Sequence, residues 1–155
     1  MIISRTLEPA TAATEPSAVS GSTQCVTGSG RGRPLPGAPW SLRLARGTGG
    51  RAALEVYEHG TLLDVVVATP LAAELLRGAR RAQCGGRYRA MAWGRLLSDR
   101  AAVSVTFRRG RIRPALSVAE VTEIGASFWV AVADGHFGRV CVGYGHADRC
   151  SPARS

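Results

Sequence analysis

The side chains with the greatest capacity for chemistry in this chain are arginines, and they gather in one segment. Residues 77–113 contain eleven arginines and a single acidic residue, Asp99, whereas residues 1–76 carry six arginines and six acidic residues. Arginine binds phosphate through paired hydrogen bonds, and a cluster without compensating carboxylates repels itself unless an anion is present. The segment therefore predicts a polyanionic partner, either nucleic acid or an acidic protein surface.

The distribution of the arginines matters more than their number. All 20 basic residues are arginine and none is lysine, a ratio that a GC-rich coding sequence gives without selection on function. Coding bias does not sort arginines into one segment, however. Aromatic residues inside the segment could stack on bases. The predicted nucleic-acid-binding residues are Tyr88, Trp93, Arg77, Arg80, Arg81, Arg87, Arg89, Arg95, Arg108, Arg109, Arg111 and Arg113.

Other motifs point less clearly to chemistry. Cys141, His146 and Cys150 are zinc-type ligands, but no C-x2-C pair accompanies them, and a small buried cysteine is the favoured interpretation of Cys141. The glycine-rich stretch at residues 28–32 has neither a predicted strand before it nor a helix after it, so it is not a phosphate loop. No serine or cysteine has a histidine at a recognisable nucleophile spacing. We therefore expect no catalytic residue, no metal and no cofactor.

Two carboxylates, Glu55 and Asp64, have two possible roles. A hairpin turning at His59-Gly60 would place Glu55 directly opposite Asp64, where two carboxylates could act as general acid and base or hold a divalent cation. Arg43 is predicted to lie beside Glu55 on the preceding strand. A structural charge row of Arg43, Glu55 and Asp64 is favoured, because it relieves the repulsion between like charges that face each other.

These residues need strands to position them. Alternating apolar and polar residues predict strands over residues 41–45, 54–58, 61–67, 87–93, 103–107, 128–133 and 136–144. The dipeptides His59-Gly60 and Asp134-Gly135 predict two hairpin turns. The hairpin over residues 128–144 is largely apolar on both faces, so it should lie in the middle of the sheet or under the helix.

A helix is predicted over residues 70–83. Thr69 is an acceptable N-cap and Pro70 suits the first helical position. The apolar residues that follow recur at helical spacing, and Gly85-Gly86 would end the helix. The expected fold class is therefore α+β, an antiparallel sheet of six to eight strands packed with one principal helix at about 70–83.

The domain organisation follows from composition. Residues 1–39 are rich in small and polar residues and predict a disordered tail, residues 40–147 a single α+β domain, and residues 148–155 a frayed C-terminus. The chain has no secretory signal and no apolar run approaching a membrane span of about 18 residues. We therefore expect a cytoplasmic protein with no membrane contact and four reduced cysteines.

Together these features predict a small cytoplasmic non-enzymatic regulator that engages nucleic acid through the arginine-rich segment, with DNA binding and transcription regulation as the expected role. The alternative is a protein–protein interaction module whose arginine face meets an acidic partner.

Overall fold

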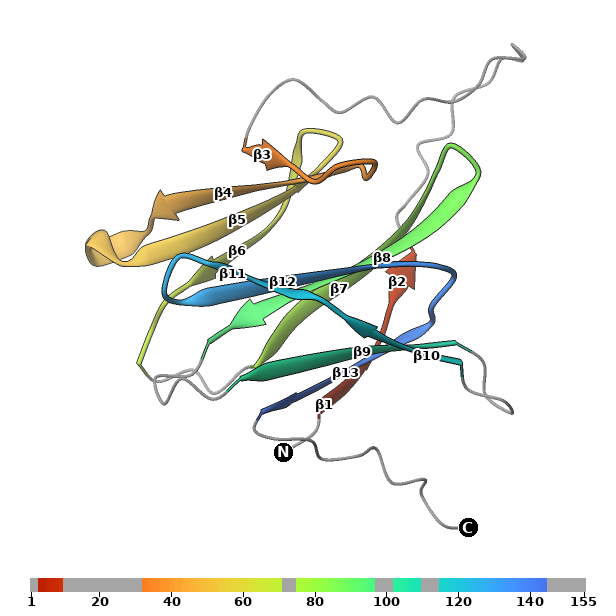
Figure 1. Ribbon diagram of the computed structural model, residues 1–155. Helices are drawn as coiled ribbons and strands as arrows, with labels where there is room; N and C mark the ends of the chain where they lie inside the picture. The colour runs from red at the N-terminus through yellow and green to blue at the C-terminus, as the bar shows by residue number, and fades with distance from the viewer. Residues whose placement is uncertain (1–2, 10–31, 71–74, 97–101, 110–114, 145–155) are drawn as a thin grey trace.

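The chain folds almost entirely into β-strands. The computed structural model describes residues 3–9, 32–70, 75–96, 102–109 and 115–144 (Figure 1). Within these ranges there is no α-helix, only a short 3-10 turn at Thr48–Gly50, and so no helix that could cross a membrane. The strands are β1 Ile3–Thr6, β2 Glu8–Pro9, β3 Arg33–Pro34, β4 Trp40–Arg46, β5 Ala52–Glu58, β6 Thr61–Val67, β7 Leu76–Cys84, β8 Arg87–Arg95, β9 Val103–Arg109, β10 Ala115–Ala119, β11 Val121–Ile124, β12 Phe128–Asp134 and β13 Arg139–Tyr144.

The strands form three sheets that stack as layers (Figure 1). The hairpin sheet has the order β3-β4-β5-β6, the central sheet β11-β12-β8-β7-β2, and the terminal sheet β1-β13-β9-β10. Neighbouring strands are antiparallel except for β2 and β7, which are parallel, with Glu8 beside Arg80. Two apolar clusters, one on each side of the central sheet, hold the layers together.

The central sheet is buried on both faces, and its residues alternate accordingly. Ala90 and Ala92 of β8 pack toward the terminal sheet, whereas Met91 and Trp93 pack toward the hairpin sheet. Strand β12 alternates in the same way between the two clusters. Strand β12 therefore lies inside the central sheet, between β8 and β11, as a strand with two apolar faces should.

The predicted α+β class and its principal helix at about 70–83 are wrong. Residues 76–84 form strand β7, which pairs with β8 in an antiparallel hairpin; residues 71–74 lie outside the described ranges. Gly85 and Gly86 both adopt positive φ, 54° and 76°, so they close a two-residue hairpin turn instead of ending a helix. The glycine pair was the stronger local signal, and tertiary pairing with β8 overrode the helical spacing.

The hairpin predicted over residues 128–144 is also wrong. Strand β12 pairs with β8 and β11 in the central sheet, whereas β13 pairs with β9 and β1 in the terminal sheet. Asp134 and Gly135 begin a crossover between layers, with Gly135 at φ 135°. Since both strands are rich in apolar residues, the sequence supported each strand but did not determine its partner.

The predicted disordered tail contains ordered strands at its start. Strand β1 pairs with β13, and the Leu7 side chain, 2% exposed, belongs to the cluster between the central and terminal sheets. The end of the predicted tail is ordered too, with strand β3 and the fully buried Ala38. Residues 10–31 of the tail, and residues 148–155, the predicted frayed end, lie outside the described ranges. Residues 3–9 are ordered because strand pairing and one buried leucine offset the entropy of fixing them.

Candidate anion-binding sites

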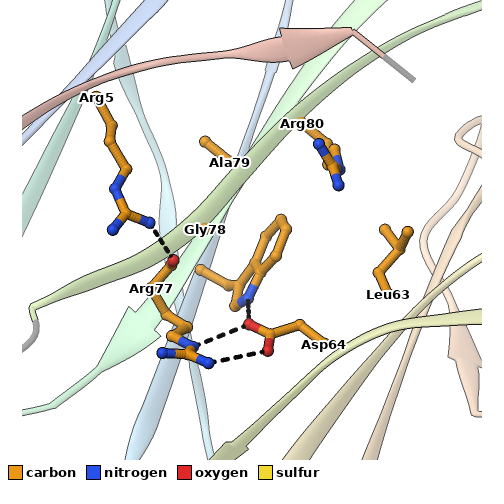
Figure 2. Close-up of a pocket in the computed structure, with 8 residues that line it drawn as sticks. Arg5, Leu63, Asp64, Arg77, Gly78, Ala79 and Arg80 are labelled. Carbon is orange, nitrogen blue, oxygen red and sulfur yellow. Dashed lines mark hydrogen bonds and ion pairs between the residues drawn. The ribbon is translucent and has the colours of Figure 1, made fainter. Parts of the chain in front are cut away.

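The structure divides the predicted arginine surface between two separate sites. We call the first the edge pocket, a cavity of about 720 Å³ where the edges of the three sheets meet. Figure 2 shows three arginines of this pocket around Gly78, with Asp64 facing Arg77. The pocket is lined by Arg5, Leu63, Asp64, Arg77, Gly78, Ala79, Arg80 and Trp93.

Asp64 reaches the edge pocket because of an irregularity in the first hairpin. The His59-Gly60 turn is confirmed, with Glu58 opposite Thr61, but the register shifts between Val56 and Tyr57. Val56 then lies opposite Asp64, and the predicted pairing of Glu55 with Asp64 is wrong. A one-residue shift moves a side chain to the other face of its strand. Asp64 consequently faces the central sheet, where it accepts a hydrogen bond of 3.0 Å from Trp93 Nε1.

A second irregularity places the arginine that faces Asp64. Leu76 pairs with Gly94 and Gly78 with Trp93, so Arg77 is an extra residue in β7. Its guanidinium donates to Asp64 at 3.3 and 3.5 Å. Gly78 is required beneath it, because a Cβ at that position would overlap the Trp93 ring. The bulge therefore turns an arginine of the central sheet toward the hairpin sheet.

Arg5 is a pocket residue that the sequence interpretation missed. It comes from β1, which was assigned to the tail, and its Nη1 donates to the Arg77 carbonyl at 2.6 Å. The sequence signal was weak, because Ile3 and Thr6 are β-branched residues that favour strands but residues 3–7 do not alternate between apolar and polar. Among the described lining residues, three guanidinium groups therefore accompany one carboxylate.

We call the second site the end hollow, a shallow cavity of about 620 Å³ beside the β7–β8 turn. Tyr88 is 42% exposed, and its ring meets His136 edge to face with 4.8 Å between ring centroids. The Gly135 amide donates to the Tyr88 carbonyl at 2.7 Å, which fixes the crossover loop against β8. The hollow is lined by Arg87, Tyr88, Arg109, Asp134, Gly135 and His136.

Several predicted nucleic-acid-binding residues have structural contacts instead. Trp93 is 3% exposed and belongs to the core, so it presents no ring for stacking. Arg89 forms an ion pair of 2.6 Å with Asp134 and donates to the Pro36 carbonyl. Arg95 is half-buried and donates to the Thr69 carbonyl.

Two further arginines of the segment that the structure describes line neither site. Arg81 is half-buried and pairs with Ala90 in the central sheet, and Arg108 is half-buried in the terminal sheet. Arg111 and Arg113 lie outside the described residues. The arginines that the structure describes thus do not form one continuous phosphate-contacting face, and the interpretation as a DNA-binding transcription regulator is corrected on this ground.

Glu55, the carboxylate that was expected opposite Asp64, forms an ion pair at the surface. Arg43 lies opposite Glu55 as predicted and donates to it at 2.6 and 3.0 Å. The hydrogen bond from Arg43 to Glu55, together with the negative charge of Glu55, raises the pKa of Arg43 above its ordinary value. Asp64 is absent from this charge row, so only its Arg43–Glu55 half is confirmed.

The cysteines and potential metal ligands offer no further site in the described part of the chain. Cys84 is disulfide-bonded, which corrects the expectation of four reduced thiols, and Cys141 is a buried free thiol. Among the described residues, no three His, Cys, Asp or Glu side chains gather as metal ligands would; His146 and Cys150 of the zinc alternative fall outside them.

Comparison with protein-family models, with curated proteins and with solved structures found no match, so the chemistry of the two sites carries the functional argument.

Proposed function

We propose that this protein is a small non-enzymatic binding domain that takes single-stranded nucleic acid at the end hollow. The observation that carries the proposal is the position of Tyr88, an exposed aromatic ring that lines one hollow with the exposed Arg87 and Arg109. A base would stack on the tyrosine while the arginines contact the flanking phosphates. This arrangement retains three of the residues that the sequence singled out.

The charge around the hollow favours a polyanion. Asp134 is the one acidic residue among the described residues that line it, and this carboxylate already pairs with Arg89. Arg87 and Arg109 therefore remain as the net positive charge facing solvent. Two arginines predict a modest salt dependence, with a slope of log K against log salt of about −1.4 on a single strand.

The aromatic ring distinguishes a single strand from the other anionic partners. In a duplex the base faces are already stacked on one another, so an exposed tyrosine gains little from them. An acidic protein surface would meet the arginines but has no need of the stacking platform. We therefore place single-stranded nucleic acid before the acidic protein partner.

The test is fluorescence anisotropy with a labelled single-stranded RNA of 12 nucleotides between 50 and 200 mM salt. Tyr88→Ala should weaken binding about 5- to 150-fold, the range expected for one lost base–aromatic stack. Tyr88→Phe should bind like the unmodified protein, because the ring is kept. Arg109→Ala should lower both the affinity and the salt slope.

The control is Arg51→Ala, which removes an equally exposed arginine next to the 3-10 turn, at the other end of the view in Figure 1 from the β7–β8 turn. This variant should bind as tightly as the unmodified chain. Equal binding by Tyr88→Ala, or tighter binding to a polyglutamate peptide than to the RNA, would overturn the proposal and favour the acidic protein partner.

Location in the cytoplasm stays a proposal, and the disulfide at Cys84 counts against it, because disulfides persist in oxidising compartments and are rare in the cytoplasm. Alkylation of freshly lysed cells followed by mass spectrometry tests the location. Cys84 found reduced in the cell would support it. Complete protection of Cys84 from alkylation would contradict that location.

A further inference from the structure

We infer that the edge pocket is a second anion site, separate from the end hollow, and that it binds a small, multiply charged phosphate such as pyrophosphate. Its volume of about 720 Å³ lies within the range of small-molecule sites, about 300–1,000 Å³. None of the residues that line the edge pocket also lines the end hollow. The two sites can therefore be tested independently.

The charge of the pocket calls for an anion. Arg5, Arg77 and Arg80 line it with Asp64 as the single carboxylate among the described lining residues. Asp64 pairs with Arg77, so the charge of Arg5 is not matched by a described lining carboxylate, and a bound polyanion would supply negative charge beside it. Arginine is also suited to phosphate, since its planar fork makes two parallel hydrogen bonds to adjacent oxygens.

The arginines are held by different layers of the fold. Arg5 belongs to the terminal sheet and Arg77 to the central sheet, and the Arg5 guanidinium is fixed on the Arg77 carbonyl. The carboxylate of Asp64 comes from the hairpin sheet. A phosphate that contacts Arg5 and Arg77 would link the terminal and central sheets, and since it binds only the folded chain, binding should raise thermal stability.

Asp64 occupies the place of a competing anion in this arrangement. Its bonds to Arg77, at 3.3 and 3.5 Å, are longer than a strong charge-assisted hydrogen bond of about 2.7–2.9 Å. Its closer contact is with Trp93 Nε1 at 3.0 Å. A phosphate could therefore take over the Arg77 guanidinium while Asp64 keeps its bond to the indole.

This competition gives a test in which a binding site and a merely structural ion pair predict opposite results. Asp64→Asn keeps an oxygen that can accept from Trp93 but removes the charge that competes for Arg77. Pyrophosphate should bind this variant about two- to fivefold more tightly, the factor expected for one partly exposed ion pair. If Asp64 and Arg77 form only a structural pair, the same variant should not gain affinity.

The experiment is isothermal titration calorimetry of the full chain with sodium pyrophosphate, with ionic strength held constant by sodium chloride. At a hundredfold excess over Kd, pyrophosphate should raise the Tm by about 5 °C or more. Arg5→Gln should weaken binding at least fivefold, whereas Arg46→Gln, an exposed arginine on β4, should leave it unchanged.

Two results would overturn the inference. One is a chain that responds to pyrophosphate no more than to chloride at the same ionic strength. The other is an Arg5→Gln variant that folds with an unchanged Tm and still binds as tightly as the unmodified chain. Tyr88→Ala should leave pyrophosphate binding intact, which separates this site from the proposed nucleic-acid site.

Discussion

The edge pocket and the end hollow both draw arginines from the β7–β8 hairpin, yet the same residue type plays different parts in them. In the pocket, Arg77 is held by a carboxylate from another sheet and stands over a buried tryptophan. In the hollow, Arg87 is exposed beside the hairpin turn, past the layers that enclose the middle of the strands. Distance from the stacked core, more than sequence, decides whether an arginine of this hairpin contacts another sheet or stays exposed to solvent.

The pocket and the hollow should also differ in how a mutation affects the free energy of unfolding. Residues of the pocket contact all three sheets, so changing them should lower the free energy of unfolding as well as any affinity. Residues of the hollow contact little beyond their own strand and the crossover loop, so changing them should affect binding alone. Four substitutions, two of them with a comparison variant, test this contrast and are given in order of their expected effect on stability.

Leu7→Ala should have the largest effect, because Leu7 anchors the strand that carries Arg5. Removing a fully buried leucine should lower the free energy of unfolding by about 2–5 kcal/mol. Urea denaturation monitored by tryptophan fluorescence measures the change. An unchanged midpoint would show that residues 3–9 do not pack, and the pocket would then lose one of its walls.

Trp93→Phe should follow, with a loss of about 1.5–3 kcal/mol, since the hydrogen bond to the charged Asp64 disappears. Tyr88→Phe is its counterpart on the same strand and should change the free energy of unfolding very little, because the Tyr88 ring is largely solvent-exposed. Equal losses for the two variants would erase the distinction between pocket and hollow.

Gly78→Ala should cost about 1–3 kcal/mol, the range for forcing an extra methyl group against a packed core. The neighbouring glycine at the hairpin turn gives the comparison. A Cβ at Gly86 meets no atom within 4 Å, and only its positive φ resists substitution, so Gly86→Ala should cost about 1 kcal/mol. Thermal denaturation of both variants measures the difference.

Arg87→Ala should have the smallest effect on stability, within about 0.5 kcal/mol, as for most exposed substitutions. A fall in RNA affinity without a fall in Tm would be the signature of a residue that serves binding only. A Tm lowered by several degrees would mean that the hollow, like the pocket, helps to hold the fold.

Much of the local structure could be predicted from the sequence, and its long-range arrangement could not. The His59-Gly60 turn is confirmed because a glycine at φ 81° follows a histidine at φ 48°, the geometry that such a dipeptide favours. The Arg43–Glu55 pair was predicted correctly because it depends on the register of two adjacent strands. Both predictions rest on interactions between residues close in the chain.

The errors share a different cause. Two bulges, at Leu63 and Arg77, shift the register by one residue each. No residue type marks the first, and Gly78, which marks the second, was interpreted as a weak point in a helix. The two bulges alone bring Asp64 and Arg77 together. The helix prediction failed because Leu75, Leu76 and Ala79 fit a helical stripe as well as a buried strand. Trp93 was misassigned because exposure depends on the neighbouring sheet, which alternation along one strand does not report.

The pairing of β1 with β13 has a consequence for how the chain is made. Ser4 and Cys141 contact each other across 137 positions of sequence. At a synthesis rate of about 5–20 residues per second, the ribosome needs about 7–27 s to make the partner after the first strand. Through that interval β1 has no partner strand, and Leu7 has no completed core to pack into. The terminal sheet can form completely only after β13 has left the ribosome. The chain therefore completes this sheet late in synthesis, and Arg5, which β1 contributes to the edge pocket, reaches its place at the same late stage.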